Sequence, residues 1–205
     1  MKILIHGLGH KADSWNKVIT YMNNDKYILC PNLSEILNGK EASYDNLYSS
    51  FSEYCNKIEG KIDLCGLSLG GILALNYAID YPNKVEKLVL IGTPHKVPKV
   101  MFSIQNIIFK LLPKNIFETM AFNKKDTFIL GKTMKNLDFS NRVQNIKCPT
   151  LIICGEKDNA NIKSAHYLAE NIENEKLEIM KNTGHIINEE SPKELAKTLT
   201  EFWKD

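Results

Sequence analysis

A serine set between glycines, where a predicted strand runs into a predicted helix, constrains the fold of this chain more than any other feature. The apolar run 61–64 favours a buried strand, and the run 72–78 favours a helix. Between them lies the motif Gly66-Leu67-Ser68-Leu69-Gly70. Side chains on Gly66 and Gly70 would collide in a tight turn, so glycine is expected at both positions. The pattern predicts that Ser68 is strained and stands out above the edge of a sheet.

The motif by itself also fits an ordinary glycine–serine turn, so the polar residues that follow other predicted strands matter. Three such segments each follow an apolar run: His6-Gly7-Leu8-Gly9 after 3–5, Gly155 to Asp158 after 150–154, and Gly184-His185 after 177–180. A nucleophile, an acid and a histidine therefore follow in the chain order Ser68, Asp158, His185. Each stands just beyond a predicted strand.

In these segments the chain resembles the α/β-hydrolase superfamily, in particular its small serine esterase-like members with a short helical cap. The matching segments cover nearly the whole sequence in the family's order: His6–Gly9, Gly66–Gly71, Tyr81–Val85 with Leu88–Ile91, Cys148–Asp158 and Gly184–His185. The resemblance implies the order serine, acid, histidine of this fold, which differs from the orders in two other serine protease folds.

Predicted strands and helices alternate along the chain, which favours a parallel sheet with helices on both faces. The expected strands are 2–5, 27–30, 61–64, 87–91, 150–154 and 176–180. The resembled family usually has a β-hairpin before its His-Gly strand, whereas only Met1 and Lys2 precede Ile3 here. We therefore expect an α/β-hydrolase fold with a mostly parallel six-stranded sheet and a small helical cap insert.

Residues 94–139 interrupt the alternation, because this stretch holds no convincing strand and is rich in Met and Phe. By resemblance it is the cap that covers the active site, and residues 1–93 and 140–205 are the hydrolase core of a single domain. An ordinary pair of amphipathic helices packed on the core is the alternative. Arg142 and Asp138 are expected to form a surface or hinge pair beneath the insert.

Composition narrows the class of protein. The 205 residues suffice for one domain with a buried core, and a net charge of +2 without a basic stripe argues against nucleic-acid binding. The odd number of cysteines, without a C-x-x-C pair, indicates reduced thiols and no metal site. No segment resembles a signal peptide or reaches membrane-spanning length, which indicates a cytoplasmic protein without a membrane span.

The resemblance implies a catalytic triad. Ser68 would attack a carbonyl carbon, His185 would accept the serine proton, and Asp158 would orient the histidine and stabilise its charged form. Asp158 also fits a carboxylate that caps the next helix, and Glu156 is then the substitute acid. This chemistry requires no metal and no cofactor.

Two backbone amides would bind the oxyanion. The N–H group of Leu69 lies in the first turn of the predicted helix, where it has no partner within the helix. The N–H group of Leu8 qualifies by resemblance because it directly follows His6-Gly7, and His6 is expected to shape that loop. Gly66 and Gly70 are the elbow glycines.

The other histidines are interpreted differently. His10 either borders the entrance of the site or belongs to a solvated loop. His95 and His166 are interpreted as non-catalytic.

The leading functional prediction is a serine hydrolase that cleaves a carboxylic ester through an acyl-enzyme, with a small apolar acyl or alkyl group. A cap rich in Phe, Met and Ile favours such a group. A small-molecule thioester or a carbon–carbon bond is the alternative substrate within this class. A ligand-binding, receptor-like protein or a lyase of the same fold is the alternative from other classes.

Overall fold

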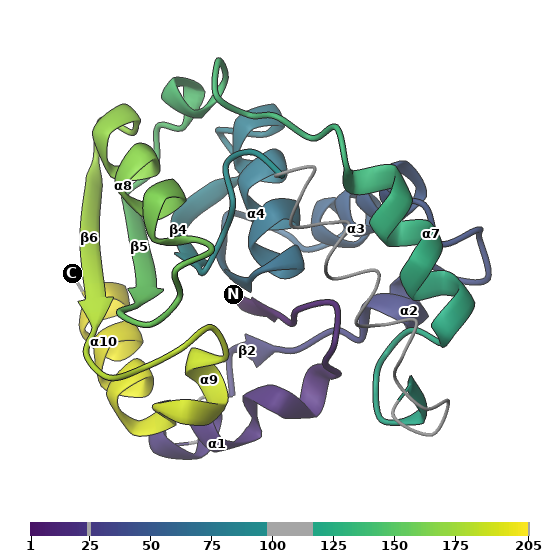
Figure 1. Ribbon diagram of the computed structural model, residues 1–205. Coiled ribbons are helices and arrows are strands. Elements are labelled where there is room, and N and C mark those ends of the chain that lie inside the picture. The colour runs from purple at the N-terminus through teal and green to yellow at the C-terminus, as the bar shows by residue number, and fades with distance from the viewer. Residues whose placement is uncertain (24–25, 98–116, 205) are drawn as a thin grey trace.

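The computed structural model describes residues 1–23, 26–97 and 117–204. Six strands form one sheet in the order β2-β1-β3-β4-β5-β6, and all neighbouring strands run parallel (Figure 1). The strands are β1 (Lys2–Ile5), β2 (Ile28–Leu29), β3 (Ile62–Leu67), β4 (Val85–Ile91), β5 (Thr150–Gly155) and β6 (Glu175–Met180). The expected α/β-hydrolase fold with a six-stranded sheet is confirmed.

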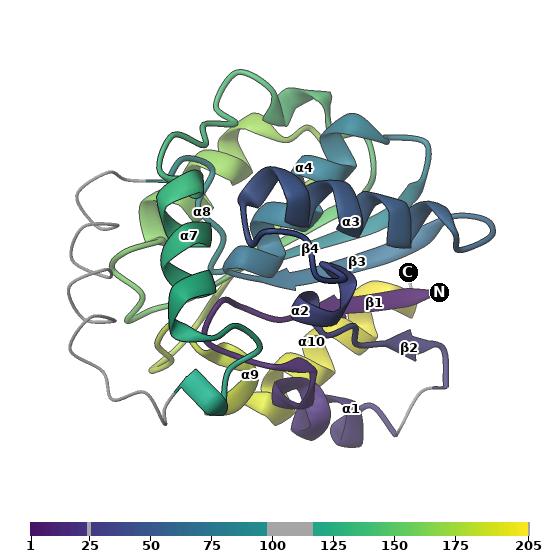
Figure 2. The same ribbon diagram turned by 90° about the vertical axis from the view of Figure 1, so that its right-hand side faces the viewer.

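Helices cover both faces of the sheet (Figure 2). One face packs against α2 (Leu33–Ile36), α3 (Tyr44–Asn56), α4 (Leu69–Asp80), α7 (Lys124–Met134) and α8 (Ile162–Asn171). The other face packs against η1 (Ala12–Trp15), α1 (Asn16–Tyr21), α9 (Ile187–Glu190) and α10 (Pro192–Lys204). A further 3₁₀ turn, η2 (Val143–Asn145), precedes β5.

Alternation within the central strands builds two cores, one on each face. Leu88 and Leu90 of β4 join the cluster under α3, α4 and α8, whereas Val89 and Ile91 join the cluster under α1 and α10. Because these strands are buried on both faces, they read in the sequence as continuous apolar runs. The parallel pairing brings the carboxyl ends of the strands to one edge, where the loops that carry polar residues begin.

The two ends of the insert 94–139 are hydrogen-bonded to each other and form a stem. The carbonyl of His95 accepts the N–H of Phe139 at 2.9 Å, and the N–H of Val97 donates to Leu137 at 3.0 Å. The apolar residues expected between Met101 and Ile116 lie outside the described residues. Within the described part of this stretch, α7 packs against α3.

The expected pair between Arg142 and Asp138 is wrong. Asp138 instead bonds to Lys96 across the stem at 2.6 Å, and Arg142 bonds to Asp80 at the end of α4. The N–H and the hydroxyl of Ser140 also donate to the Asp138 carboxylate and hold it towards its own turn.

Along the three described ranges, no helix has both the length and the apolar composition needed to cross a membrane.

Candidate active site

The turn between β3 and α4 holds Ser68 in a strained backbone conformation, with φ 55° and ψ −111°. A Cβ built on Gly66 would lie 2.2 Å from the carbonyl oxygen of Gly70, and one built on Gly70 would lie 2.2 Å from that of Ile5. No side chain fits at either position. The N–H of Ser68 donates to the carbonyl of Ile91 at 2.9 Å, which ties the turn to the neighbouring strand.

The strain at this turn has a measurable consequence. Glycine adopts a positive φ at little cost, whereas alanine has the same steric conflict as serine. We expect Ser68→Gly to be more stable than Ser68→Ala by about 1 kcal/mol in the free energy of unfolding. Urea denaturation of the two variants measures this difference. Equal midpoints would contradict the presence of strain.

The loop after β1 lies against Ser68. A Cβ built on Gly7 would be 3.6 Å from the Cβ of Ser68, so the expected oxyanion loop and the serine turn are in close proximity. Leu69 is the first residue of α4, which leaves its N–H without an intrahelical partner. Leu8, which follows Gly7 in the loop after β1, has a buried side chain.

His6 holds this loop in place from within the core. Its Nε2 accepts the backbone N–H of Leu33 at 3.1 Å, so its Nδ1 carries the proton and donates to the carbonyl of Gly7 at 2.8 Å. The ring is fully buried, and burial lowers its pKa. The neutral His6 ring, with a hydrogen bond at each nitrogen, therefore has the structural role that its position in the motif predicts.

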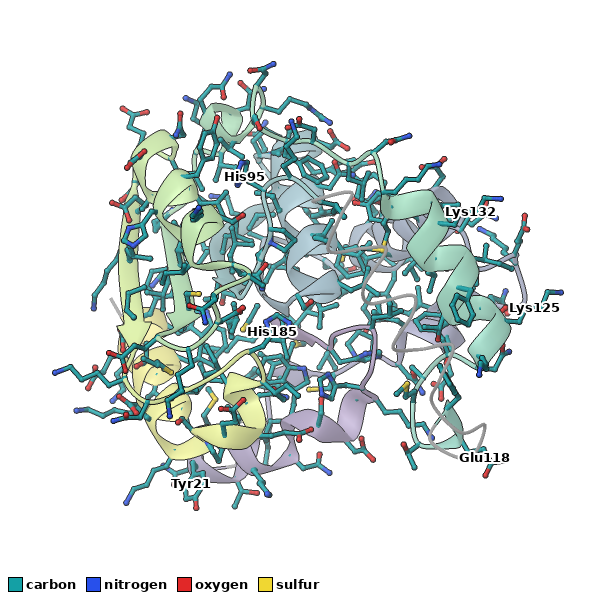
Figure 3. All side chains as sticks on the ribbon, viewed as in Figure 1. Tyr21, His95, Glu118, Lys125, Lys132 and His185 are labelled. Atoms are coloured by element: carbon teal, nitrogen blue, oxygen red, sulfur yellow. The ribbon has the colours of Figure 1, made fainter. Side chains whose placement is uncertain are left out.

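Asp158 and His185 are brought into direct contact. The Asp158 carboxylate Oδ2 lies 2.6 Å from Nδ1 of His185, and the side chain of Asp158 is 3% exposed while that of His185 is 38% exposed. The imidazole lies over Gly92, where a Cβ would come within 2.9 Å of Nδ1. His185 lies near the middle of the view in Figure 3.

Ser68 and the imidazole stand at neighbouring strand ends. Leu67 of β3 pairs with Ile91 of β4, so Ser68 and Gly92 are the next residues along two adjacent strands. The carboxylate and the imidazole are thus in contact beside Gly92, at the strand end next to the serine turn.

The carboxyl of Asp158 has a lowered pKa. Burial alone would raise this pKa, but the hydrogen bond and the charge of His185, together with hydrogen bonds from Asn161, outweigh the effect of burial. The carboxylate is therefore ionised at neutral pH and accepts a hydrogen bond from the Nδ1–H group of His185. Sequence reasoning missed Asn161, whose only signal is its place three residues after the acid.

The loop that carries His185 is held by two carboxylates. Glu190 accepts the N–H groups of Gly184 at 2.7 Å and Ile186 at 3.1 Å, the residues on either side of the histidine. Glu156, the substitute acid considered from the sequence, accepts the N–H of Asn182 at 2.8 Å. Both carboxylates bind backbone amides of this loop, and the carboxylate bonded to the imidazole is that of Asp158.

The end of β5 approaches the same loop so closely that only glycine fits. A Cβ on Gly155 would lie 2.0 Å from the carbonyl oxygen of Gly184 and 2.4 Å from that of Thr183. We expect Gly155→Ala to lower the free energy of unfolding by about 2 kcal/mol, because backbone must shift to admit the methyl group. Gly9→Ala is the control, since a Cβ there has nothing within 4 Å. Chemical denaturation of both variants tests this, and equal losses would contradict the close approach.

His10 does not belong to a solvated loop. Its Nε2 lies 3.7 Å from Glu189, and its largely buried Nδ1 faces Gly7, with no hydrogen-bond partner among the described residues. Burial is the main cause that lowers its pKa. The ring lines a hollow of about 510 Å³ together with these residues: Gly9, Lys11, Asp13, Ser14, Lys17, Thr119 and Glu189. His10 thus borders an opening next to the loop after β1.

His95 takes part in a separate cluster. Its Nδ1 lies 3.1 Å from the hydroxyl of Ser164, and its ring stacks on Tyr167 with centroids 4.0 Å apart. Figure 3 places it well away from His185.

The thiols are free, and all except the half-buried Cys30 are buried. Burial raises the pKa of Cys148 to about 11 and of Cys154 to about 12, so both remain protonated.

Over the described residues, no group of three or more His, Cys, Asp or Glu side chains is arranged to hold a metal ion.

Comparison with known proteins identifies the family. The model of the alpha/beta hydrolase family matches residues 3–198. A monoacylglycerol lipase of Bos taurus is 23% identical over 250 residues, which cover 98% of this chain and 74% of the lipase. The pimeloyl-[acyl-carrier protein] methyl ester esterase of Wigglesworthia glossinidia brevipalpis is 28% identical over 196 residues, covering 76% of this chain and 74% of that protein.

Solved structures agree on the fold. The enol-lactonase from Burkholderia xenovorans superposes with a TM-score of 0.81 at 15% identity, covering 100% of this chain and 91% of that structure. MenH from S. aureus superposes with a TM-score of 0.80 at 20% identity, covering 99% and 92%. With its six parallel strands and a family match across almost its full length, the chain belongs to the α/β-hydrolase family of hydrolase enzymes.

Proposed function

We propose that the protein is a serine hydrolase that cleaves a carboxylic ester through an acyl-enzyme, with Ser68, His185 and Asp158 as its catalytic triad. The observation that carries the proposal is the 2.6 Å contact between Asp158 and His185 at the strand end beside the strained serine turn. A serine hydroxyl is a weak nucleophile by itself and needs a base whose orientation is held by a third group. The carboxylate–imidazole pair supplies that arrangement.

The first half of the reaction forms the acyl-enzyme. The Ser68 oxygen attacks the ester carbonyl while Nε2 of His185 accepts the hydroxyl proton, and Asp158 stabilises the resulting imidazolium. The N–H groups of Leu8 and Leu69 bind the oxyanion, each contributing about 3 kcal/mol to transition-state stabilisation. His185 then returns the proton to the leaving alcohol.

The second half releases the acid. His185 accepts a proton from water, the water oxygen attacks the acyl carbon, and the proton passes to Ser68 as the acyl–oxygen bond breaks. The neutral His6 keeps the carbonyl of Gly7 turned inward, so the next amide, that of Leu8, faces the reacting centre.

We further propose that residues 94–139 form the cap over this site. Support comes from two contacts that join the insert to the loop after β1. The N–H of Ala121 donates to the carbonyl of His10 at 3.1 Å, and the amine of Lys11 donates to the carbonyl of Glu118 at 2.9 Å. The burial of Phe117 and Phe122 supports an insert that packs against the rest of the protein. Its apolar composition favours an apolar group in the substrate.

The substrate class follows from the site and from the relatives together. The relatives named above as a lipase and a methyl ester esterase both act on esters, which favours a small-molecule ester for this chain. Thioesters and activated carbon–carbon bonds undergo the same attack by serine and remain the alternatives within the proposal.

The test is a series of p-nitrophenyl esters of increasing acyl length, combined with a fluorophosphonate probe. We expect a burst of p-nitrophenol equal to the enzyme concentration, and labelling of Ser68 located by peptide mass spectrometry. Labelling without turnover of any ester or thioester would overturn the enzymatic proposal and favour a receptor-like protein. Turnover without labelling at Ser68 would overturn the assigned nucleophile.

A further inference from the structure

Asn161 stands at the position that precedes α8, where an asparagine side chain normally caps the helix. Here its side chain makes no capping hydrogen bond. The helix is begun instead by backbone bonds, in which the N–H of Ile162 donates to the carbonyl of Asp158. The buried amide of Asn161 is therefore used for another purpose.

That purpose is contact with Asp158. The Nδ2 atom of Asn161 lies 3.0 Å from Oδ1 and 2.9 Å from Oδ2 of the carboxylate, and the backbone N–H of Asn161 also donates to Oδ1. The same Nδ2 lies 3.3 Å from Nδ1 of His185. Because both nitrogens carry protons, they do not bond to each other. They converge as two donors on Oδ2 of Asp158.

We propose that Asn161 is a positioning residue that holds the Asp158 carboxylate towards His185. This inference rests on the proposed function of the same site. The amide donates to the carboxylate and disperses its charge, so less negative potential reaches Nδ1 of His185. A carboxylate that turned away from the ring would leave Nδ1 of His185 without its acceptor, and the tautomer that accepts the serine proton on Nε2 would no longer be held.

Other charged groups near His185 come from two further elements. His10, on the loop after β1, opposes protonation of His185 when it is itself charged, and Glu189 of α9 faces His10. Glu190 bonds to the amides on either side of His185. None of these groups touches the Asp158 carboxylate, so a change at Asn161 alters the acid directly and leaves them in place.

The decisive variant is Asn161→Asp. The substitution keeps the size of the side chain, removes the amide donor and puts a second carboxyl group beside Asp158. Two carboxyl groups this close do not both ionise at low pH, so the second charge appears only as the pair loses its shared proton, and we expect the acid limb of kcat/KM against pH to move upward. Asn159→Asp is the matched control, because Asn159 is exposed in the same loop and water screens its charge. We expect the control to leave the limb within about 0.2 unit of its original position.

A second variant separates positioning from general stability. Asn161→Leu removes the two side-chain contacts to the carboxylate, keeps the backbone N–H bond and adds no charge, and we expect kcat to fall by roughly tenfold to hundredfold with little change in KM. The acid limb again moves upward, since the side-chain donor no longer shares the carboxylate with His185. A loss that is equal at every pH, with an unmoved limb in both variants, would overturn the inference and leave Asn161 a structural residue.

The pKa of His185 is also measurable without any substrate. Imidazole NMR titration follows the ring directly, and the signal missing from His185→Gln identifies it. An upward shift of the His185 titration midpoint in Asn161→Asp supports the inference even if no ester is hydrolysed. In that case only the proposed function is overturned. Ester hydrolysis by the original protein without a shift in the variant overturns the inference alone.

Discussion

Replacing Ser68 with alanine is expected to lower kcat for ester hydrolysis by at least about 10⁴-fold. The hydroxyl oxygen is the attacking atom in the proposed mechanism, and no other side chain replaces it at the end of β3. Loss of one member removes most of the effect of a triad, since the remaining two have nothing to activate. Steady-state hydrolysis of a p-nitrophenyl ester measures the loss, and the burst and the fluorophosphonate label disappear with it.

The control for this variant is Ser49→Ala, in which an exposed serine of α3 is changed far from the strand ends. We expect the control to retain full activity and both proteins to keep the helix content of the original. Activity within tenfold of the original in Ser68→Ala would remove the serine from the mechanism, because water attack without an acyl-enzyme would then suffice.

Asp158→Asn is expected to reduce kcat by about 10⁴-fold, the second largest effect. The carboxylate accepts a hydrogen bond from the Nδ1–H group of His185, which leaves Nε2 unprotonated and able to accept the serine proton. An amide that turns its NH₂ group to Nδ1 favours the opposite tautomer and cannot stabilise the imidazolium. The variant also loses its charge-assisted bonds with Asn161, which the rate measurement registers together with the loss of the acid.

Glu156→Gln is the comparison for the acid, because Glu156 lies two residues earlier and bonds to the N–H of Asn182. Its amide oxygen still accepts that bond, so we expect no more than about a threefold loss of kcat/KM, equivalent to the energy of one weakened hydrogen bond. A small loss in Asp158→Asn combined with a large one in Glu156→Gln would transfer the role of acid to Glu156.

The positions of the strands and the turn at Ser68 could be predicted from the sequence because each follows from local rules. A run of apolar residues in β4 or β5 indicates a strand buried on both faces, and the glycines on either side of Ser68 indicate a turn without room for side chains. The chain order of Ser68, Asp158 and His185 then places all three beyond strand ends. The short helices α2 and α9 escaped prediction because a single turn of helix carries no periodic signal.

The sequence by itself determined the family, the six strands and the three polar residues at their carboxyl ends, because close packing and tight turns restrict which residue types fit. Only the tertiary structure decided how those residues are held. His6 bonds to Leu33, Asn161 bonds to Asp158 in place of capping its helix, and Glu190 bonds to the amides beside His185. Hydrogen bonds of this kind join atoms whose separation depends on the whole fold, and a polar side chain has several partners within reach until the backbone around it is in place.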